Sequence, residues 1–420
     1  MSTSKEQGGS PSLIALGRYA SIALSLLTVP IVARVLGPDG RGVSATMIAV
    51  VTIATVLVGL GVPLVLRRRI AEGESLTATL SAGRMFALLT LLPSLILGFA
   101  VNFVLFRESS FPDQLAFIVS MCLIPLSVSW AQDVSVLVAT RQFHRMAILG
   151  VLQAGTMFST IVVLWLTASV SIAGVVYASS LGNVVAFMVG LLWLRSGLGQ
   201  FRLMRQIAAE GWTLIGAQLA DVSTRRLDQV IALPLLGPVG AGLYSVAATV
   251  SSLSTPIAHA TAAAMFKGMT GEDAADNGSG ARTMRYGFAL GTLLVIPMAI
   301  ASIVGIPILF GEEYRDAILP TVILCAAVPA TIATYCGATW MAAQKQGLRL
   351  TAIQIVTVVA LVAGFFVLSA PLAVIGAALG VCIALFVSNA MVAHAVAERI
   401  RDTVPRWRDF PAAIRILLRG

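Results

Sequence analysis

Leu36-Gly37-Pro38-Asp39-Gly40-Arg41-Gly42 has a second copy 200 positions later, Leu236-Gly237-Pro238-Val239-Gly240-Ala241-Gly242, in a chain of 420 residues. A single repeated motif of Gly and Pro can arise by chance in an apolar sequence. A true duplication should show the same register elsewhere in the chain. At an offset of 204, Phe106 corresponds to Phe310 and Pro125 corresponds to Pro329. Because self-similarity at a fixed period reveals architecture, we predict that one half-length unit is present twice.

The composition indicates where these halves reside. Apolar residues make up 58% of the chain and charged residues 11%, and the mean hydropathy is +0.92. So few polar side chains cannot cover a water-facing surface, and we therefore expect an integral membrane protein. Backbone groups in lipid must be satisfied within the segment, which favours helices.

Twelve apolar runs are long enough to cross a hydrocarbon core about 30 Å thick, which takes roughly 20 helical residues. They cover approximately 13–36, 43–66, 83–106, 115–138, 146–167, 172–194, 212–236, 241–266, 286–310, 318–342, 350–369 and 372–396. We predict an all-α membrane protein with about 12 transmembrane helices. Its parts are an N-terminal six-helix lobe at 1–200, a C-terminal six-helix lobe at 201–398, and a basic cytoplasmic tail at 399–420, which suits an interfacial helix at the inner membrane surface.

The distribution of Lys and Arg predicts the orientation, because cytoplasmic segments retain positive charge. We expect the protein in the inner or plasma membrane, with both termini in the cytoplasm. In this orientation most of the 28 basic residues fall on the cytoplasmic side, Arg84 among them. The external side then carries Arg34, Arg41, Arg107 and Arg315. The net charge of +9 therefore follows from topology, and no nucleic-acid partner is expected.

An even number of spans in each half makes the repeat parallel, with a pseudo-twofold axis along the membrane normal. Two such lobes leave a cleft at the midplane, and rocking about it gives alternating access. This architecture favours a transporter. The four cysteines lie inside spans without metal or disulfide spacing, and no cofactor or metal site is expected.

Charged residues inside the seventh predicted span suggest a site, because each costs at least about 2.5 kcal/mol at mid-span. Gln218, Asp221, Arg225 and Asp228 follow one another at spacings of three, four and three, which places them on one helical face, with Arg226 about 100° away. One interpretation is self-neutralisation, in which Asp221 and Asp228 flank Arg225 as intrahelical partners.

The other interpretation is a cationic binding site. Arg226 has no carboxylate on its own face, and Arg18 in the first span has no local acid. Two unpaired guanidinium groups facing a cleft would suit a phosphate, which Arg binds in a fork geometry. Asp133 in the fourth span is the alternative partner. It is also, with Asp221 and Asp228, a candidate for ion coupling.

His259 in the eighth predicted span has two interpretations. It could shuttle protons, or it could be a packed and hydrogen-bonded side chain among Ala and Thr.

Several motifs resemble those of the polysaccharide-biosynthesis flippases. The first is Val29-Pro30-Ile31-Val32-Ala33-Arg34-Val35-Leu36-Gly37-Pro38-Asp39-Gly40-Arg41-Gly42, which resembles the opening signature of that family. Arg226-Leu227-Asp228-Gln229-Val230 and the turn that continues to Leu243-Tyr244-Ser245 resemble its seventh span. Phe310-Gly311-Glu312-Glu313-Tyr314 and Met341-Ala342-Ala343-Gln344-Lys345-Gln346-Gly347 also fit, so that the resemblance covers nearly the whole chain.

The resemblance implies a member of the multidrug, oligosaccharidyl-lipid and polysaccharide exporter superfamily. Such a protein moves an undecaprenyl-pyrophosphate-linked oligosaccharide from the cytoplasmic to the external leaflet, with membrane lipids and a coupling ion, a proton or sodium, as further partners. Arg18, Arg225 and Arg226 are the candidate cations for that substrate.

Other classes fit the sequence less well. A multidrug or organic-cation exporter of the same superfamily, driven by an ion gradient, remains the main alternative, although it would be expected to expose acids toward its substrates. A polysaccharide polymerase or ligase would need a sizeable external loop, and the external loops here span only a few residues. The sequence has no Gly-x-x-x-x-Gly-Lys-Ser/Thr loop of an ATP-driven exporter.

Overall fold

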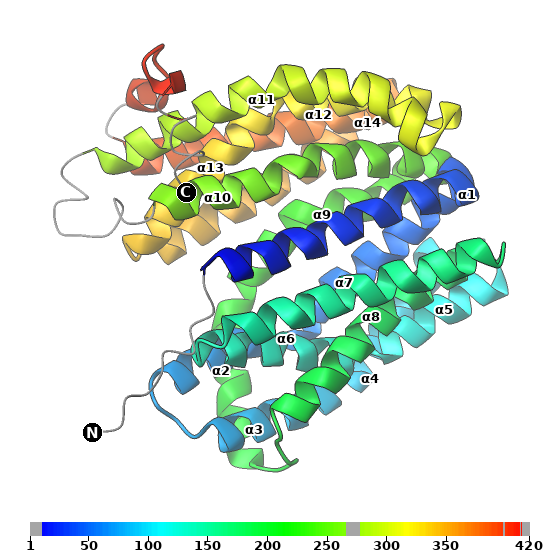
Figure 1. The fold of residues 1–420 in the computed structure, drawn as a ribbon, viewed down its shortest axis with the longest axis vertical. Coiled ribbons are helices and arrows are strands. Elements are labelled where there is room, and N and C mark those ends of the chain that lie inside the picture. The colour runs from blue at the N-terminus through cyan, green and yellow to red at the C-terminus, as the bar shows by residue number, and fades with distance from the viewer. Residues whose placement is uncertain (1–10, 266–277, 398–399, 412, 414–420) are drawn as a thin grey trace. The chain divides into compact units, whose positions relative to one another are not determined.

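The computed structural model describes residues 11–265, 278–397, 400–411 and 413, with the side chains of 11–19 and 22 left out. All regular structure in these ranges is helical (Figure 1). The α-helices are α1 (Pro11–Gly59), α2 (Val62–Ala71), α3 (Leu76–Leu89), α4 (Leu91–Leu105), α5 (Phe111–Cys122), α6 (Ile124–Ala139), α7 (Phe143–Leu166), α8 (Ile172–Trp193), α9 (Phe201–Ser251), α10 (Thr255–Met265), α11 (Ser279–Phe310), α12 (Ile318–Ala326), α13 (Val328–Ala343) and α14 (Gly347–Val396). Short 3₁₀ helices, η1 (Ser252–Ser254), η4 (Glu312–Ala317) and η5 (Ile400–Thr403), join or follow them.

The protein is a multi-pass membrane protein. Seven described helices are long and apolar enough to cross a bilayer, and the number rises to nine if each of two bent pairs counts as one span. The pairs are α5 with α6, bent by 44°, and α12 with α13, bent by 41°. Pro125 and Pro329 stand in the first turns of α6 and α13, where a missing N–H costs nothing. The predicted number of twelve spans stays a prediction.

Three of the long helices contain a residue with non-helical backbone, at which two helices join: Gly37 in α1, Gly237 in α9 and Ala373 in α14. The sequence predicts a multi-residue turn at 37–42, whereas the structure reverses at one residue and is helical again from Pro38. Proline suits this place because its fixed φ is compatible with the first helical position.

The two copies of the opening motif have the same local structure. Gly37 has φ 65° and ψ −179°, and Gly237 has φ 71° and ψ 175°, a region that favours glycine. A Cβ on Gly40 would lie 2.9 Å from Leu36 Cβ, and a Cβ on Gly240 would lie 2.7 Å from Leu236 Cβ. The motif predicts positive φ at glycines of a tight turn, which is confirmed at Gly37 and Gly237 only, whereas Gly40 and Gly240 are helical and closely packed.

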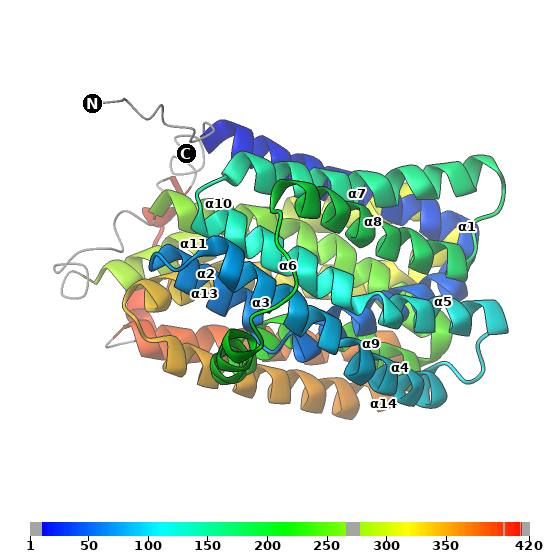
Figure 2. The ribbon, with the colours of Figure 1, turned by 90° about the horizontal axis from the view of Figure 1, so that it is seen from below.

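By its internal contacts the chain divides into two compact units, Met1–Val222 and Ser223–Gly420. In the first unit α7 packs between α1 and α8, as Figure 2 shows for α7 and α8. One core cluster joins α2, α3, α6 and the first turns of α9 through residues such as Leu66, Leu80, Leu137 and Ile207. In the second unit α13 packs against α11, α10 and α14.

The second unit also binds part of the basic tail. Arg285 Nε in α11 lies 3.4 Å from Asp409 Oδ2, and Phe410 packs with Ala289 and Leu290. Residues 414–420 lie outside the described residues, so the interfacial helix stays a prediction. The sequence also places a loop over 267–285. Residues 266–277 are not described, and α11 already begins at Ser279, which corrects the end of that loop.

Candidate functional site

The charged residues of the seventh predicted span lie on α9, which is helical without interruption from Phe201 to the break at Gly237. The predicted helical face is therefore present. Asp221 is half-buried, whereas Arg225 and Arg226 are exposed. Arg226 forms no hydrogen bond or salt bridge with any residue that the structure describes.

Asp228 is turned into the second unit, where it is 7% exposed. Its Oδ2 accepts a hydrogen bond of 2.7 Å from the Tyr244 hydroxyl, and its Oδ1 accepts one of 2.9 Å from the Gln229 N–H. Tyr244 is fully buried, with its ring edge-on to Phe365 at 5.4 Å. Within the described residues Asp228 forms hydrogen bonds but no salt bridge, and the self-neutralisation of Arg225 stays a prediction.

Sequence reasoning missed Tyr244 as the partner of Asp228. Asp228 lies nine residues before Gly237 and Tyr244 seven residues after it. A chain reversal at Gly237 places Asp228 and Tyr244 opposite one another on two antiparallel helices. The second Leu-Gly-Pro motif therefore indicated that these two residues could meet.

Asp133 pairs with Arg84. Asp133 in α6 is 0% exposed, and its Oδ1 accepts a hydrogen bond of 2.5 Å from Arg84 Nη2 in α3. The distribution of basic residues predicts Arg84 on the cytoplasmic side, and Asp133 is predicted as an alternative partner for Arg18 and Arg226, whereas the described partner of Asp133 is Arg84. Arg84 is only 5% exposed and its charge is paired inside the first unit, so it is not an exposed loop residue, while its side of the membrane stays a prediction.

Two further groups position this ion pair. The Arg84 guanidinium carbon lies 4.9 Å from the centroid of the Phe187 ring, a cation–π distance. Gly190, also on α8, leaves room for the carboxylate, because a Cβ there would lie 2.4 Å from Asp133 Oδ2. Asp133 Oδ2 and the Arg84 Nε and Nη1 atoms are buried without a hydrogen-bond partner among the described residues.

Arg18 falls in the first turns of α1, but its side chain is outside the described residues. The remaining titratable candidate, His259 in α10, is hydrogen-bonded through Nδ1 to the Tyr335 hydroxyl in α13, and the two rings are 4.3 Å apart. This contact favours the packed interpretation of His259.

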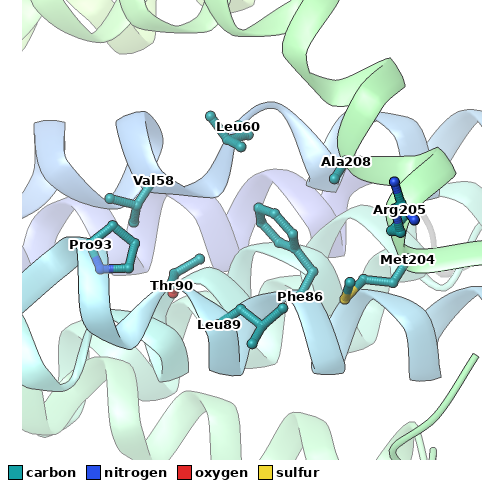
Figure 3. A pocket seen from close by; sticks show the side chains of 9 residues that line it. All are labelled: Val58, Leu60, Phe86, Leu89, Thr90, Pro93, Met204, Arg205 and Ala208. Atoms are coloured by element: carbon teal, nitrogen blue, oxygen red, sulfur yellow. The ribbon is translucent and has the colours of Figure 1, made fainter. Parts of the chain in front are cut away.

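A cavity of about 380 Å³ lies in the first unit (Figure 3). Val58 and Leu60 come from the end of α1, and Met204, Arg205 and Ala208 from the start of α9. The remaining walls come from α3, the residue between α3 and α4, and α4: Phe86, Leu89, Thr90 and Pro93. The lining is apolar except for Thr90 and Arg205.

The start of α9 is fixed to α2 beside this cavity. Glu210 receives hydrogen bonds from Arg68 and Arg69, and Arg69 Nη1 lies 3.2 Å from Glu74. The hydrogen bond to Glu210 raises the pKa of the Arg69 guanidinium above its ordinary value. Gly211 packs so closely that a Cβ there would lie 2.3 Å from the Leu60 carbonyl oxygen.

Among the described residues, no group of three or more His, Cys, Asp or Glu side chains could hold a metal ion. The fold is that of an all-helical, multi-pass membrane protein with charged side chains inside its candidate spans. Three solved structures have similar folds: the lipid II flippase MurJ in an inward closed conformation, a multidrug resistance MATE family transporter of the MOP superfamily facing inward, and a MOP superfamily transporter from Pyrococcus furiosus.

The likeness extends over nearly all of each chain. MurJ aligns with a TM-score of 0.76 at 10% identity, over 97% of this chain and 92% of its own. The MATE transporter aligns with a TM-score of 0.69 at 18% identity, over 92% of this chain and 98% of its own. The Pyrococcus furiosus protein aligns with a TM-score of 0.56 at 13% identity, over 96% of this chain and 94% of its own.

The sequence identifies the family more narrowly. The profile of the polysaccharide biosynthesis protein family matches residues 11–266, and the chain belongs to that family. The resemblance found in its motifs is thereby confirmed. A search of curated proteins gave no match.

Proposed function

We propose that this protein is a flippase that moves a lipid-linked oligosaccharide, on an undecaprenyl-pyrophosphate carrier, from the cytoplasmic to the external leaflet for the synthesis of a surface polysaccharide. Membership of the polysaccharide biosynthesis protein family and the fold shared with a lipid II flippase support this class of cargo. Alternating access of two lobes, 1–200 and 201–398, provides the route.

The observation that carries the proposal is the separation of charge on α9. Arg226 is exposed on a helix within a candidate span, while Asp228, two residues later, is buried and hydrogen-bonded to Tyr244. An exposed guanidinium that forms no salt bridge with a described residue suits a pyrophosphate, because Arg forms charge-assisted, two-pronged hydrogen bonds with phosphate oxygens. Arg225 beside it and Arg18 on α1 complete the proposed set of cations.

Twelve spans and a parallel repeat belong to the same proposal. Splitting α1, α9 and α14 at their non-helical residues, joining α2 to the second part of α1 and α10 to the second part of α9, and counting α3 with α4 and each bent pair as one span gives six spans per half. Matched turns support the repeat: Arg141 and Lys345, related by the offset of 204, both have φ 58°. The orientation with both termini in the cytoplasm follows from the positive-inside distribution.

A proton or sodium gradient is the proposed energy source, with Asp133, Asp221 and Asp228 as the candidate coupling or charge-partner residues. Asp133 and Asp228 are already engaged, so a coupling ion would compete with Arg84 at the first and with Tyr244 at the second. Such competition is one way for ion binding to change the packing of a lobe.

The test is the double variant Arg225→Ala and Arg226→Ala, with Arg202→Ala as a matched control. Arg202 is exposed on the same helix but lies near its start. Membrane insertion and protein level should be unchanged in both proteins. Delivery of lipid-linked glycan to the outer leaflet should stop in the double variant and persist in the control.

Undiminished delivery in the double variant would exclude these arginines as the binding site. Deletion of the protein separates the two transporter classes. Accumulation of lipid-linked oligosaccharide on the inner leaflet supports a flippase, whereas unchanged glycan export with raised sensitivity to cationic drugs would support the multidrug alternative.

A further inference from the structure

The groove between α1, α3, α4 and the start of α9 has no part in the proposed cargo site. Its volume of about 380 Å³ is more than twice the roughly 150 Å³ that accommodates benzene in an apolar cavity. All of its lining residues belong to the first unit, Met1–Val222. The question is what fills it in a membrane.

The walls favour hydrocarbon. Seven of the nine lining side chains are wholly apolar: Val58, Leu60, Phe86, Leu89, Pro93, Met204 and Ala208. The eighth, Thr90, donates its hydroxyl to the Ala87 carbonyl at 2.6 Å and so offers the groove little polarity. Water would find too few polar partners here, whereas a methylene chain would need none.

One end of the groove is cationic. Arg205 is exposed, and within the described chain it forms no hydrogen bond or salt bridge. Its neighbours on the inward face of α9, Met204 and Ile207, are buried. The first turns of α9 are thus amphipathic, and Figure 3 places the Arg205 side chain beside Met204 at one end of the apolar lining. This pattern of apolar floor and basic rim matches a lipid with an anionic headgroup.

The wall that carries Arg205 is firmly held. Arg68 and Arg69 bind Glu210, one and a half turns further along α9, and Gly211 lies against the backbone at Leu60. A groove that depends on a fixed helix has a defined shape. It therefore suits a resident lipid better than transient contact with bulk lipid.

We propose that this groove binds one acyl chain of an anionic phospholipid, with the phosphate of the same lipid at Arg205. The cargo's own tail is a different occupant, and the geometry favours the phospholipid. Twenty residues separate Arg205 from Arg225 along α9, roughly 30 Å at 1.5 Å per residue. Arg205 is therefore separate along α9 from the proposed cargo cations, and the proposal assigns it to a second anion.

Photo-crosslinking of the full-length protein in vesicles tests the proposal. The probe is phosphatidylglycerol with a diazirine in its acyl chain, compared with the matching phosphatidylcholine probe, and the adducts are mapped by mass spectrometry. Adducts are expected on Leu89, Pro93 or Met204, with a preference for phosphatidylglycerol of about fivefold, which corresponds to roughly 1 kcal/mol for one basic residue near the membrane surface. Unlabelled phosphatidylglycerol should compete, and phosphatidylcholine should not.

Three variants separate the parts of the site. Arg205→Gln should remove the headgroup preference while acyl adducts remain, and the control Arg202→Gln should behave as the native protein. Ala208→Phe should fill the groove and abolish the adducts of both probes. A bulky side chain at position 208 could also disturb folding. Leu89→Trp, on the exposed rim, is therefore a second variant whose side chain should fill the groove. Only variants that elute as a single species are compared.

Adducts spread over the lipid-facing surface, or a phosphatidylglycerol preference that survives Arg205→Gln, would overturn the proposal. Competition by polyprenyl pyrophosphate but not by phosphatidylglycerol would also overturn it and would assign the groove to the cargo's tail. The result is independent of the cargo site, because the probes contain no glycan and the proposed flippase activity is not measured.

Discussion

Arg84 and Asp133 form a buried ion pair between α3 and α6, with Nη2 of the arginine 2.5 Å from Oδ1 of the aspartate. Neither side chain has more than 6% of its surface exposed. Taking two opposite charges into a dry interior is expensive, and the pair persists only because each neutralises the other. It therefore fixes how α3 lies on α6 within the first unit.

Removing one partner of this pair should lower the free energy of unfolding far more than replacing both. Asp133→Ala leaves the Arg84 charge buried without compensation and should lower the free energy of unfolding by about 3–5 kcal/mol. Arg84→Met combined with Asp133→Leu replaces both charges by apolar groups and should recover most of that loss. Equilibrium unfolding in one detergent measures all three variants. Equal destabilisation of the single and double variants would mean that the charges are not paired in the folded protein.

The carboxylate of Asp133 also depends on Gly190. Alanine at 190 would place a Cβ 2.4 Å from Oδ2, and the carboxylate cannot move aside without leaving Arg84. Gly190→Ala should therefore destabilise the first unit, even though alanine gains about 1 kcal/mol of helix propensity over glycine. Gly305→Ala is the matched control, because Gly305 also lies within a helix and a Cβ there would meet no described atom within 4 Å. The control should be neutral or stabilising, and equal melting temperatures for the two variants would contradict the close contact.

The hydrogen bond between Tyr244 and Asp228 holds the second unit's buried carboxylate. Tyr244→Phe removes the hydroxyl and leaves Oδ2 of Asp228 without its donor, which should cost about 1–3 kcal/mol in unfolding free energy. Asp228→Asn should also be destabilising, because an amide that keeps its oxygen toward Tyr244 turns its NH₂ toward the Gln229 N–H. Tyr177→Phe, at a more exposed tyrosine on α8, provides the control. A smaller loss from Tyr244→Phe than from the control would show that Asp228 does not need this donor.

The sequence was informative where the signal is local. Gly37 and Gly237 could be assigned a positive φ because the motif itself requires a reversal, and α9 could be assigned a polar face because helical spacing is fixed. Arg84 could not be placed. It stands at the start of an apolar run, like a loop residue, and only its contact with Asp133, 49 positions away, shows that it is buried. The positive-inside rule assigns a charged residue to one side of the membrane from its neighbours in the sequence. Whether the side chain is buried depends instead on a partner that is distant in the sequence.

A parallel repeat makes a prediction about sidedness that an inverted repeat contradicts. Arg141 and Lys345 occupy matched turns before α7 and α14, and both should face the cytoplasm, whereas Arg107 and Arg315 should both face outward. Each position is changed singly to Cys after the four native cysteines, Cys122, Cys325, Cys336 and Cys382, have been replaced by Ser or Ala. An impermeant maleimide added to whole cells should label Arg107→Cys and Arg315→Cys, and should reach Arg141→Cys and Lys345→Cys only after the membrane is opened. Labelling of Arg107→Cys but not Arg315→Cys in whole cells would place an odd number of crossings between the matched loops, and the two lobes could then no longer be copies that enter the membrane in the same direction.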